Sequence, residues 1–219
     1  MNYLIIDIET IPDDTVEKPI LDELSIKFGN TKDPDKKQII IEKAKDEFAT
    51  GLTKKMSIDS NFARILSIGG ILVNEKYEEI KRFCYYGDDS DSEIISQFID
   101  FINTEDIDII VGWNSKKFDI PMIWKRGILT GNKVWSIDIK DKMISKYGNY
   151  SIDLMQTWNG FDSYGKLSDC AKRLNIKCKT GLDGSMIYQA FKDGRKKDIM
   201  DYNMEDCEVT LAILKRVYL

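Results

Sequence analysis

The chain has 219 residues, of which 42% are hydrophobic and 32% charged, and its formal net charge is −5. This composition is typical of a globular protein, and the length suffices for one large domain or two small ones. Histidine is absent, which excludes a Ser-His-Asp relay, an H-E-x-x-H zinc site and an imidazole general base built from this chain. Acid–base or metal chemistry must therefore rest on carboxylates, Lys, Tyr or Cys.

The four cysteines form no C-x-x-C pair, and the acidic Asp7 and Glu9 interrupt the first apolar run. We therefore expect no secretory signal, reduced thiols and a cytoplasmic location. The apolar runs are shorter than the ~20 residues that span a bilayer, so the sequence gives no support for a membrane role. The excess of acidic over basic residues argues against a broad basic surface that would bind nucleic acid. It still allows a local site in which bound cations make the electrostatic potential positive.

The first third of the chain predicts strands around a helical insert. Residues 1–11 alternate between two faces, as in a buried strand. Residues 21–52 are polar and Lys-rich, and we expect a solvated insert whose helix begins at Asp33-Pro34 and ends at Gly51. Residues 63–73 and 77–86 read as two strands joined at Asn74-Glu75, so that an antiparallel three-stranded start is expected.

The rest of the chain alternates strands with helices. The apolar periods predict strands at 107–111 and 151–155, and helices at 92–103, 118–129, 167–174, 185–191 and 196–217. Asp153 and Asp183 are expected to act as capping and turn residues. We find no repeat or linker, and the pattern favours a single mixed α/β domain over residues 1–219, with an antiparallel half and a parallel half.

Two acids share one face of the first strand. Asp7 and Glu9 lie two residues apart, on the face that also carries Tyr3 and Ile5. Buried side by side, two carboxylates repel each other unless a proton, hydrogen bonds or a cation compensates them, and a divalent metal is a compact solution for oxygen ligands. The alternative is a strand end at which both acids are simply solvated.

The last helix supplies an independent acid. At 100° per residue, Asp206 lies in one apolar stripe, which comprises Ile199, Tyr202, Asp206, Val209 and Ile213. A carboxylate at a core position requires a cation or a hydrogen-bond donor. The alternative is that this stripe faces solvent.

Asp119 follows the predicted strand at 107–111 and opens the next helix. Open α/β sheets bind ligands at such carboxyl ends of strands, so Asp119 could join Asp7 and Glu9. The competing interpretation is a helix N-cap, a role that Asp fills well before Ile-Pro.

These residues carry a resemblance to a known superfamily. Asp7-Ile8-Glu9-Thr10, Asn114-x-x-x-Phe118-Asp119 and Tyr202-x-x-x-Asp206 resemble, in this order, the three exonuclease motifs of the DEDD superfamily. The tyrosine points to the tyrosine-containing (DEDDy) branch, which includes the proofreading domains of family B DNA polymerases. The likeness extends to stand-alone bacterial and phage-type predicted 3′–5′ exonucleases, and it spans nearly the whole chain, least securely residues 21–52.

The resemblance implies an α/β, ribonuclease H-like (DnaQ-like exonuclease) fold, a mixed sheet with antiparallel first three strands flanked by helices. It implies metal-dependent release of 5′-mononucleotides from the 3′ end of single-stranded nucleic acid, with DNA favoured over RNA. Two Mg²⁺ or Mn²⁺ ions would be held by four carboxylates, those of Asp7, Glu9, Asp119 and Asp206, with Asp7 as the bridging ligand.

By the same similarity, Tyr202 would orient the attacking water, and Thr10, Asn114 and Phe118 would grip the terminal nucleotide, Phe118 by stacking. Replication or repair proteins are the implied partners, and the bacterial cytoplasm or a phage-infected cell is the implied location. Two other functions compete with this interpretation. One is a non-catalytic nucleic-acid-binding or polymerase-accessory module of the same fold, and the other is a ribonuclease H-like endonuclease.

Overall fold

The computed structural model describes residues 1–16, 33–132, 150–178 and 181–218. The chain divides into two compact units. The larger unit consists of Met1–Thr10 and Ile65–Leu219, and the smaller one consists of Ile11–Arg64. Within the described residues, no helix combines the length and the apolar character needed to cross a membrane.

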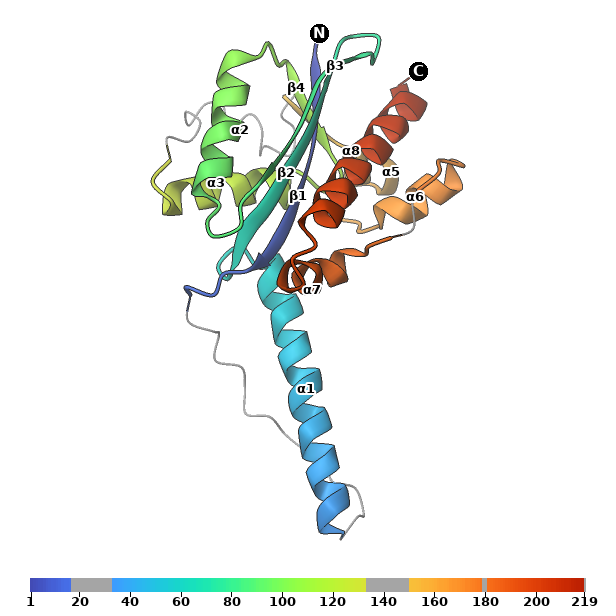
Figure 1. The fold of residues 1–219 in the computed structure, drawn as a ribbon. Coiled ribbons are helices and arrows are strands. Elements are labelled where there is room, and N and C mark those ends of the chain that lie inside the picture. Colours follow the sequence, from blue (N-terminus) through green and yellow to red (C-terminus); the bar gives the residue numbers. More distant parts are fainter. Residues whose placement is uncertain (17–32, 133–149, 179–180, 219) are drawn as a thin grey trace. The chain divides into compact units, whose positions relative to one another are not determined.

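A five-stranded mixed sheet, in the order β3-β2-β1-β4-β5, organises the larger unit. Its strands are β1 (Tyr3–Pro12), β2 (Ala63–Val73), β3 (Glu79–Tyr86), β4 (Ile109–Gly112) and β5 (Ser151–Asp153). β4 is parallel to both β1 and β5, β3 is antiparallel to β2, and β2 runs back alongside β1 in the opposite direction (Figure 1). The predicted mixed sheet with an antiparallel first half is confirmed.

Helices cover both faces of this sheet. α2 (Ser92–Thr104) and α3 (Asp119–Leu129) lie on one side, and α5 (Leu154–Asn159), α6 (Leu167–Arg173), α7 (Ile187–Lys192) and α8 (Lys196–Tyr218) lie on the other (Figure 1). A short 3₁₀ helix, η1 (Gly184–Met186), precedes α7. The chain therefore places its last and longest helix of this unit against the sheet.

The alternation in β1 divides its residues between two cores. Ile5 packs in one apolar cluster with residues of β4, α5, α6 and α8, among them Val111, Leu154, Ala171 and Ile213. The even-numbered Leu4, Ile6 and Ile8 are buried on the opposite face. Because side chains alternate along a strand, Asp7 and Glu9 are directed to the same side as Ile5, the side that α8 covers.

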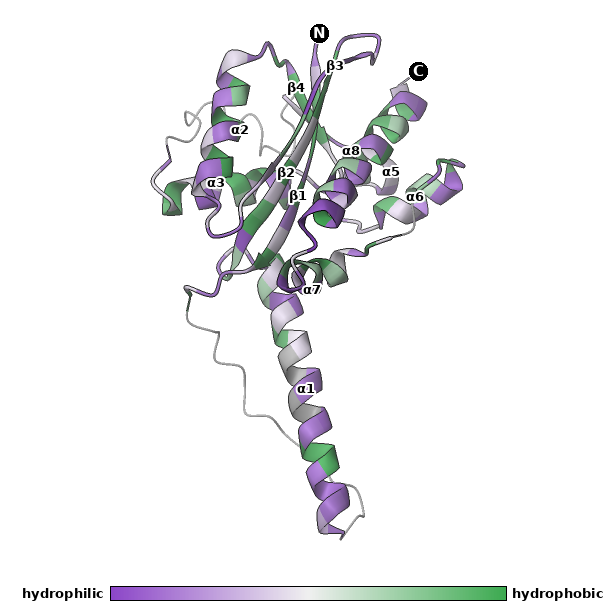
Figure 2. Ribbon diagram, viewed as in Figure 1, coloured by the Kyte–Doolittle hydropathy of each residue, from purple (hydrophilic) through white to green (hydrophobic). Residues whose placement is uncertain are grey.

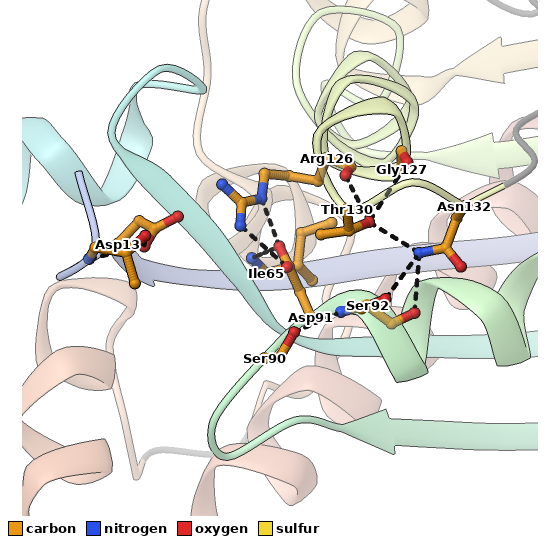
Figure 3. Close-up of polar contacts among 10 residues, drawn as sticks. Asp13, Ile65, Ser90, Asp91, Ser92, Arg126, Gly127, Thr130 and Asn132 are labelled. Carbon is orange, nitrogen blue, oxygen red and sulfur yellow. Dashed lines mark hydrogen bonds and ion pairs between the residues drawn. The ribbon is translucent and has the colours of Figure 1, made fainter.

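Buried polar contacts join the elements on the α2–α3 side. The guanidinium of Arg126 in α3 forms a two-pronged ion pair with Asp91, with Nε–Oδ2 and Nη2–Oδ1 distances of 2.6 and 3.0 Å (Figure 3). Asp91 also accepts a hydrogen bond from the Ile65 amide. At the end of α3, the Asn132 side-chain amide donates to the Ser92 carbonyl and to the Thr130 hydroxyl (Figure 3). These contacts fix α3, whose first residue is Asp119.

The smaller unit contains α1 (Pro34–Ile58), in which hydrophilic residues predominate (Figure 2). Its start at Asp33-Pro34 is as predicted, because the Asp33 side chain accepts from the Asp35 and Lys36 amides and Pro34 occupies the first turn. The predicted end at Gly51 is wrong. A single helical glycine costs only about 1 kcal/mol, and Gly51 does not adopt a positive φ that would turn the chain. Residues 21–32 of the expected insert lie outside the described residues.

Sequence and structure also differ around β5. The strand predicted at 151–155 ends at Asp153. The Asp153 side chain accepts hydrogen bonds from the Met155 and Gln156 amides and thereby caps the start of α5. This helix was not predicted from the sequence. The capping role of Asp153 is confirmed. So is the turn role of Asp183, which accepts from the amide and the hydroxyl of Ser185.

Candidate active site

The site begins on β1. The register pairs Ile5 with Val111, so Asp7 lies level with the first residues beyond the carboxyl end of β4. Glu9, two residues on, is 8% exposed, and Asp7 is partly buried. The alternative of a solvated strand end is therefore wrong. Both carboxylates are held under α8, on the face that sequence periodicity assigns to them.

α8 contributes the next acid. The stripe that contains Asp206 faces the protein interior, because Ile199, Val209 and Ile213 are all buried. Asp206 itself is partly buried, which raises its pKa, and Tyr202, one turn earlier, lies close enough to its carboxylate to lower that pKa. The alternative of a solvent-facing stripe is wrong, and the helix brings a carboxylate and a phenol to the sheet face that carries Asp7 and Glu9.

Three carboxylates converge at this face. Asp7, Glu9 and Asp206 each offer one oxygen atom, and these three atoms lie within 4.8 Å of one another. Asp119 approaches from the start of α3, where its carboxylate accepts a hydrogen bond of 3.1 Å from the Ile8 amide. Asp119 does not cap the helix, because the N-cap position belongs to Phe118. Its side chain instead joins α3 to β1 beside the other acids.

The electrostatics show uncompensated negative charge. Burial raises the pKa of Asp7 well above its usual value, and the charges of Asp206, Glu9 and Asp119 raise it further. The pKa of Glu9 is likewise raised, first by burial and then by Asp206 and Asp119. Burial also raises the pKa of Asp119 to about 7 and that of Asp206 to about 6. Among residues 1–16, 33–132, 150–178 and 181–218, no ion pair joins a Lys or Arg to these carboxylates.

A residue that the sequence analysis missed holds Asp7. The fully buried Asn203 donates from Nδ2 to Asp7 Oδ2 at 2.6 Å. The Asn203 side chain fits here because the facing residue of β2 is Gly69, which has no side chain. A Cβ at position 69 would lie 2.9 Å from Asn203 Oδ1, which is too close. The signal was present in the sequence, because Asn203, Cys207, Thr210 and Leu214 are spaced as a second helical stripe with one amide in it.

The three residues expected to hold a nucleotide lie on the segments that carry the acids. Thr10 follows Glu9 in β1 and is partly exposed. Asn114 adopts a left-handed conformation (φ 64°), which asparagine tolerates, and its carbonyl accepts from the amides of Lys117 and Phe118. This tight turn connects β4 to α3. Phe118, at the start of α3, is partly buried.

The donor set is suited to a divalent cation. All four acids offer oxygen atoms, which are the ligands that Mg²⁺ and Mn²⁺ prefer, and neither imidazole nor thiolate is directed at the cluster as zinc would favour. Cys207 is buried nearby on α8, but burial raises the pKa of its thiol and keeps it protonated. A bound cation would offset the repulsion that raises the carboxyl pKa values.

Comparison with known proteins supplies the family. The model of a family described as "Predicted 3′–5′ exonuclease related to the exonuclease domain of PolB" matches residues 57–219. The chain belongs to this 3′–5′ exonuclease family. The match includes the segments that carry Asp119, Tyr202 and Asp206, whereas Asp7 and Glu9 precede it.

Individual relatives agree with this assignment. A DNA polymerase of Archaeoglobus fulgidus is 25% identical over 156 residues, which are 67% of this chain and 20% of the polymerase. The chain thus spans about a fifth of the length of this curated relative.

Two solved structures share the fold. The family B DNA polymerase of Pyrobaculum calidifontis has a TM-score of 0.62 at 17% identity, over 99% of this chain and 24% of that one. E. coli Exonuclease I, solved in complex with a dT13 oligonucleotide, has a TM-score of 0.55 at 11% identity, over 99% and 40% of the two chains. These likenesses establish the ribonuclease H-like architecture that the sequence motifs imply.

Proposed function

We propose that this chain is a metal-dependent 3′–5′ exonuclease of the tyrosine-containing DEDD branch. In this proposal it hydrolyses phosphodiester bonds at the 3′ end of single-stranded nucleic acid and releases 5′-mononucleotides. The observation that carries the proposal is the convergence of Asp7, Glu9 and Asp206 within 4.8 Å, with Asp119 beside them and no cation of the described chain paired to them. Structural acids are normally paired or solvated, so this cluster is best explained as a metal site.

Asp7, Glu9, Asp119 and Asp206 would hold two Mg²⁺ or Mn²⁺ ions, with Asp7 shared between them. When bound, such a pair of ions generates a nucleophile from water at neutral pH and stabilises the attacking and leaving oxygens of an in-line displacement. The four acids contribute by fixing the position of that charge. Asn203 contributes by holding one oxygen of Asp7, which leaves the other oxygen with a defined direction.

Tyr202 has a different role in the proposal. Its side chain lies beside Asp206, and burial and the neighbouring acids raise the pKa of its hydroxyl, so that it remains protonated and can donate. A neutral donor next to a metal ligand orients a water molecule without adding charge. Thr10 and Asn114 would contact the terminal nucleotide through their polar groups, and Phe118 would stack on its base.

We infer that the substrate is single-stranded, with DNA favoured over RNA. A 3′ terminus must enter a site at the carboxyl edge of one sheet, and a frayed end does so more easily than a paired one. The relation to a DNA polymerase supports DNA and a role beside replication or repair proteins.

Digestion of end-labelled strands tests the proposal. A 5′-labelled oligonucleotide should give a ladder that shortens from the 3′ end, and a 3′-labelled one should release labelled mononucleotide at once. Cleavage should require Mg²⁺ or Mn²⁺ and should stop at a 3′-phosphate block. An Asp206→Asn preparation is the control for contaminating nucleases. Cuts within a circular single strand would instead indicate an endonuclease, and no cleavage of any strand would favour a non-catalytic module.

A further inference from the structure

Exposed aromatic side chains gather in one short segment of the larger unit. Trp158, Phe161 and Tyr164 are 44%, 54% and 79% exposed. Elsewhere in the described part of the chain, only Tyr150 and Tyr218 are aromatic residues of comparable exposure. Large rings are normally covered in a folded protein, so three within seven residues indicate a binding surface. We call Trp158, Phe161 and Tyr164 the aromatic platform.

The local sequence explains why this segment leaves the core. α5 ends at Asn159, and the next residue, Gly160, has a positive φ (87°) that glycine adopts without strain, while its amide donates to the Gln156 carbonyl. Asp162 also has a positive φ (65°) and forms an ion pair with Lys117 at 2.9 Å. The chain therefore turns twice between the end of α5 and the start of α6, and it presents its aromatic residues outward.

A cavity of about 310 Å³ adjoins the aromatic platform. Its lining combines a ring, a lysine, a carboxylate and small or amide side chains, namely Phe161, Lys116, Asp153, Gln156, Thr157 and Gly160. A pocket of this size is at the lower end of those that hold small ligands. Its mixture of an aromatic face, a cation and hydrogen-bonding groups is suited to one nucleotide rather than to a purely apolar side chain.

The backbone fixes this segment beside the candidate active site. The Trp113 indole donates to the Gly165 carbonyl at 2.8 Å, and Asp153 accepts from the amides of Asn114 and Lys116. Gly112 pairs with Asp153 across β4 and β5, so both strands end at the sheet edge where Asp7 lies. Strands are about 4.8 Å apart, which separates β5 from β1 by roughly 10 Å. The segment that carries the platform is thus tied to residues 113–117, the turn that leads from β4 towards Asp119.

Positive charge accompanies these rings. Lys116 lines the cavity, Lys117 faces Asp162, and Lys166 is exposed immediately before α6. Asp162 offsets the charge of Lys117, and Asp153 lines the cavity together with Lys116. In a chain of net charge −5, the local attraction for phosphates at this edge therefore comes mainly from Lys166. Aromatic rings interleaved with cations are the arrangement that single-stranded nucleic acids bind, whereas a stable protein partner would need a much larger contiguous surface.

We propose that the aromatic platform binds the single strand upstream of its 3′ end, with bases stacked on Trp158, Phe161 and Tyr164 and phosphates near the lysines. The proposal rests on the proposed function only for the direction of the strand. It adds a second binding region to Thr10, Asn114 and Phe118, and its effect is to retain long strands between successive cleavages.

Equilibrium binding without catalysis tests this. Fluorescence anisotropy of 5′-fluorescein-dT12 is measured in EDTA for the wild type, for Trp158→Ala, Phe161→Ala and Tyr164→Ala, and for Tyr218→Ala as the control. Tyr218 is equally exposed but lies twelve residues beyond Asp206 on α8, or about 18 Å along the helix. Loss of a stacking ring should weaken binding about 5- to 150-fold. Tyr218→Ala should bind as the wild type does, and the losses should be smaller for dT3 than for dT12.

The results separate this proposal from the proposed function. Weakened binding in the platform variants supports the platform even where the wild type cleaves nothing. Equal affinity of the wild type and all three variants, or no detectable binding of dT12 by the wild type, overturns it even where cleavage is normal. A tryptophan fluorescence titration adds a second measurement, because dT12 should quench the wild type and should quench Trp158→Phe less. If dT12 leaves the fluorescence of the two proteins unchanged, the exposed rings serve another partner.

Discussion

Buried acids occur on both faces of the central sheet, but only those on one face have a cationic partner. On the α2–α3 side, Asp91 is 1% exposed and forms a two-pronged ion pair with Arg126, together with a hydrogen bond from the Ile65 amide. On the α8 side, Asp7, Glu9, Asp119 and Asp206 crowd together, and the groups that offset their charge within the described residues are neutral: the Asn203 amide, the Ile8 backbone N–H and the Tyr202 phenol.

The partner of a buried carboxylate distinguishes a structural acid from one that awaits a ligand. A buried carboxylate with a guanidinium partner stabilises the fold only as long as both members are present. A cluster of buried carboxylates without such a partner destabilises the metal-free protein, as the raised pKa values show. Substitution of the ion pair on the α2–α3 side should therefore lower stability. Substitution of an acid on the α8 side should instead abolish activity without lowering stability.

The largest expected effect is the loss of activity in Asp7→Asn. Removal of a shared ligand should lower the rate of nucleotide release by about a thousandfold or more. The metal-free variant should melt at the same temperature as the metal-free wild type or higher, because a repelling charge is gone and the new side-chain carbonyl can still accept from Asn203. Single-turnover cleavage and thermal melting in EDTA measure the two effects. Near-normal cleavage, or melting several degrees lower, would contradict the metal-ligand assignment.

Arg126→Met tests the opposite face. It leaves the Asp91 charge buried and unpaired, which should reduce the free energy of unfolding by about 3–5 kcal/mol. Urea denaturation in EDTA measures this reduction. Lys81→Met is the matched control, since it breaks an exposed ion pair with Glu105 and should cost no more than about 1 kcal/mol. The double variant Arg126→Met/Asp91→Leu should recover much of the loss. Equal effects of Arg126→Met and Lys81→Met would remove the contrast between the two faces.

Tyr202→Phe should separate positioning from metal binding. Loss of the hydroxyl should lower kcat about ten- to a thousandfold, the range for a lost positioning or proton-transfer contact. Metal affinity should fall much less than in Asp206→Asn, because the neutral phenol is not itself a ligand and all four carboxylates remain. Calorimetric titration with Mn²⁺ and single-turnover cleavage, both compared with Asp206→Asn, provide the measurement. If Tyr202→Phe is fully active, or if it loses metal binding as Asp206→Asn does, Tyr202 does not position the attacking water and its ring only packs in the site.

Asn203→Ala should weaken metal binding more than it affects folding. Residues that hold a metal ligand in place typically contribute about 10- to 100-fold in metal affinity. Asn203 fits that description through its 2.6 Å hydrogen bond to Asp7. Thr210→Val is the control, because Thr210 is buried two turns further along the same stripe and makes none of the described hydrogen bonds to the four acids. Mn²⁺ calorimetry should show the loss only in Asn203→Ala. Unchanged affinity there would mean that the fold alone orients Asp7.

The smallest expected effect is the pH dependence of metal-free stability. In the folded protein the pKa values of Asp119 and Asp206 are raised to about 7 and about 6, above the ~3.9 of an unfolded chain. Their contribution is thus fully present below pH ~3.9 and is lost as pH rises through 6 and 7. We expect the melting temperature in EDTA to fall by roughly 2–4 °C per kcal/mol lost between pH 5 and pH 8. Asp206→Asn should show a shallower fall, and parallel curves would exclude this origin.

Much of the architecture could be predicted from periodicity. β1, β2, α2, α3 and α8 lie within a few residues of their predicted bounds, because each has a strong apolar pattern with a clear start. The errors concern element ends that depend on one residue. Gly51 does not end α1, and Asp153 ends β5 early by starting α5. Whether such a residue stops or starts an element depends on its neighbours in space rather than on its type.

The sequence alone determined which acids share faces. Alternation in β1 put Asp7 and Glu9 together, and the helical period put Tyr202 and Asp206 on one stripe, because both periods follow from local backbone geometry. It could not decide whether those faces were buried or solvated, nor whether Asp119 capped α3.

Those questions were decided only by tertiary structure, because burial and charge repulsion depend on which elements meet. Pairing of β1 with β4 brought Asp119 to the Ile8 amide, and packing of α8 on the sheet brought Asp206 to Asp7. The same packing placed Asn203 against Gly69, which lies 134 positions away in the chain, so that the one amide in the second stripe of α8 became the donor to Asp7.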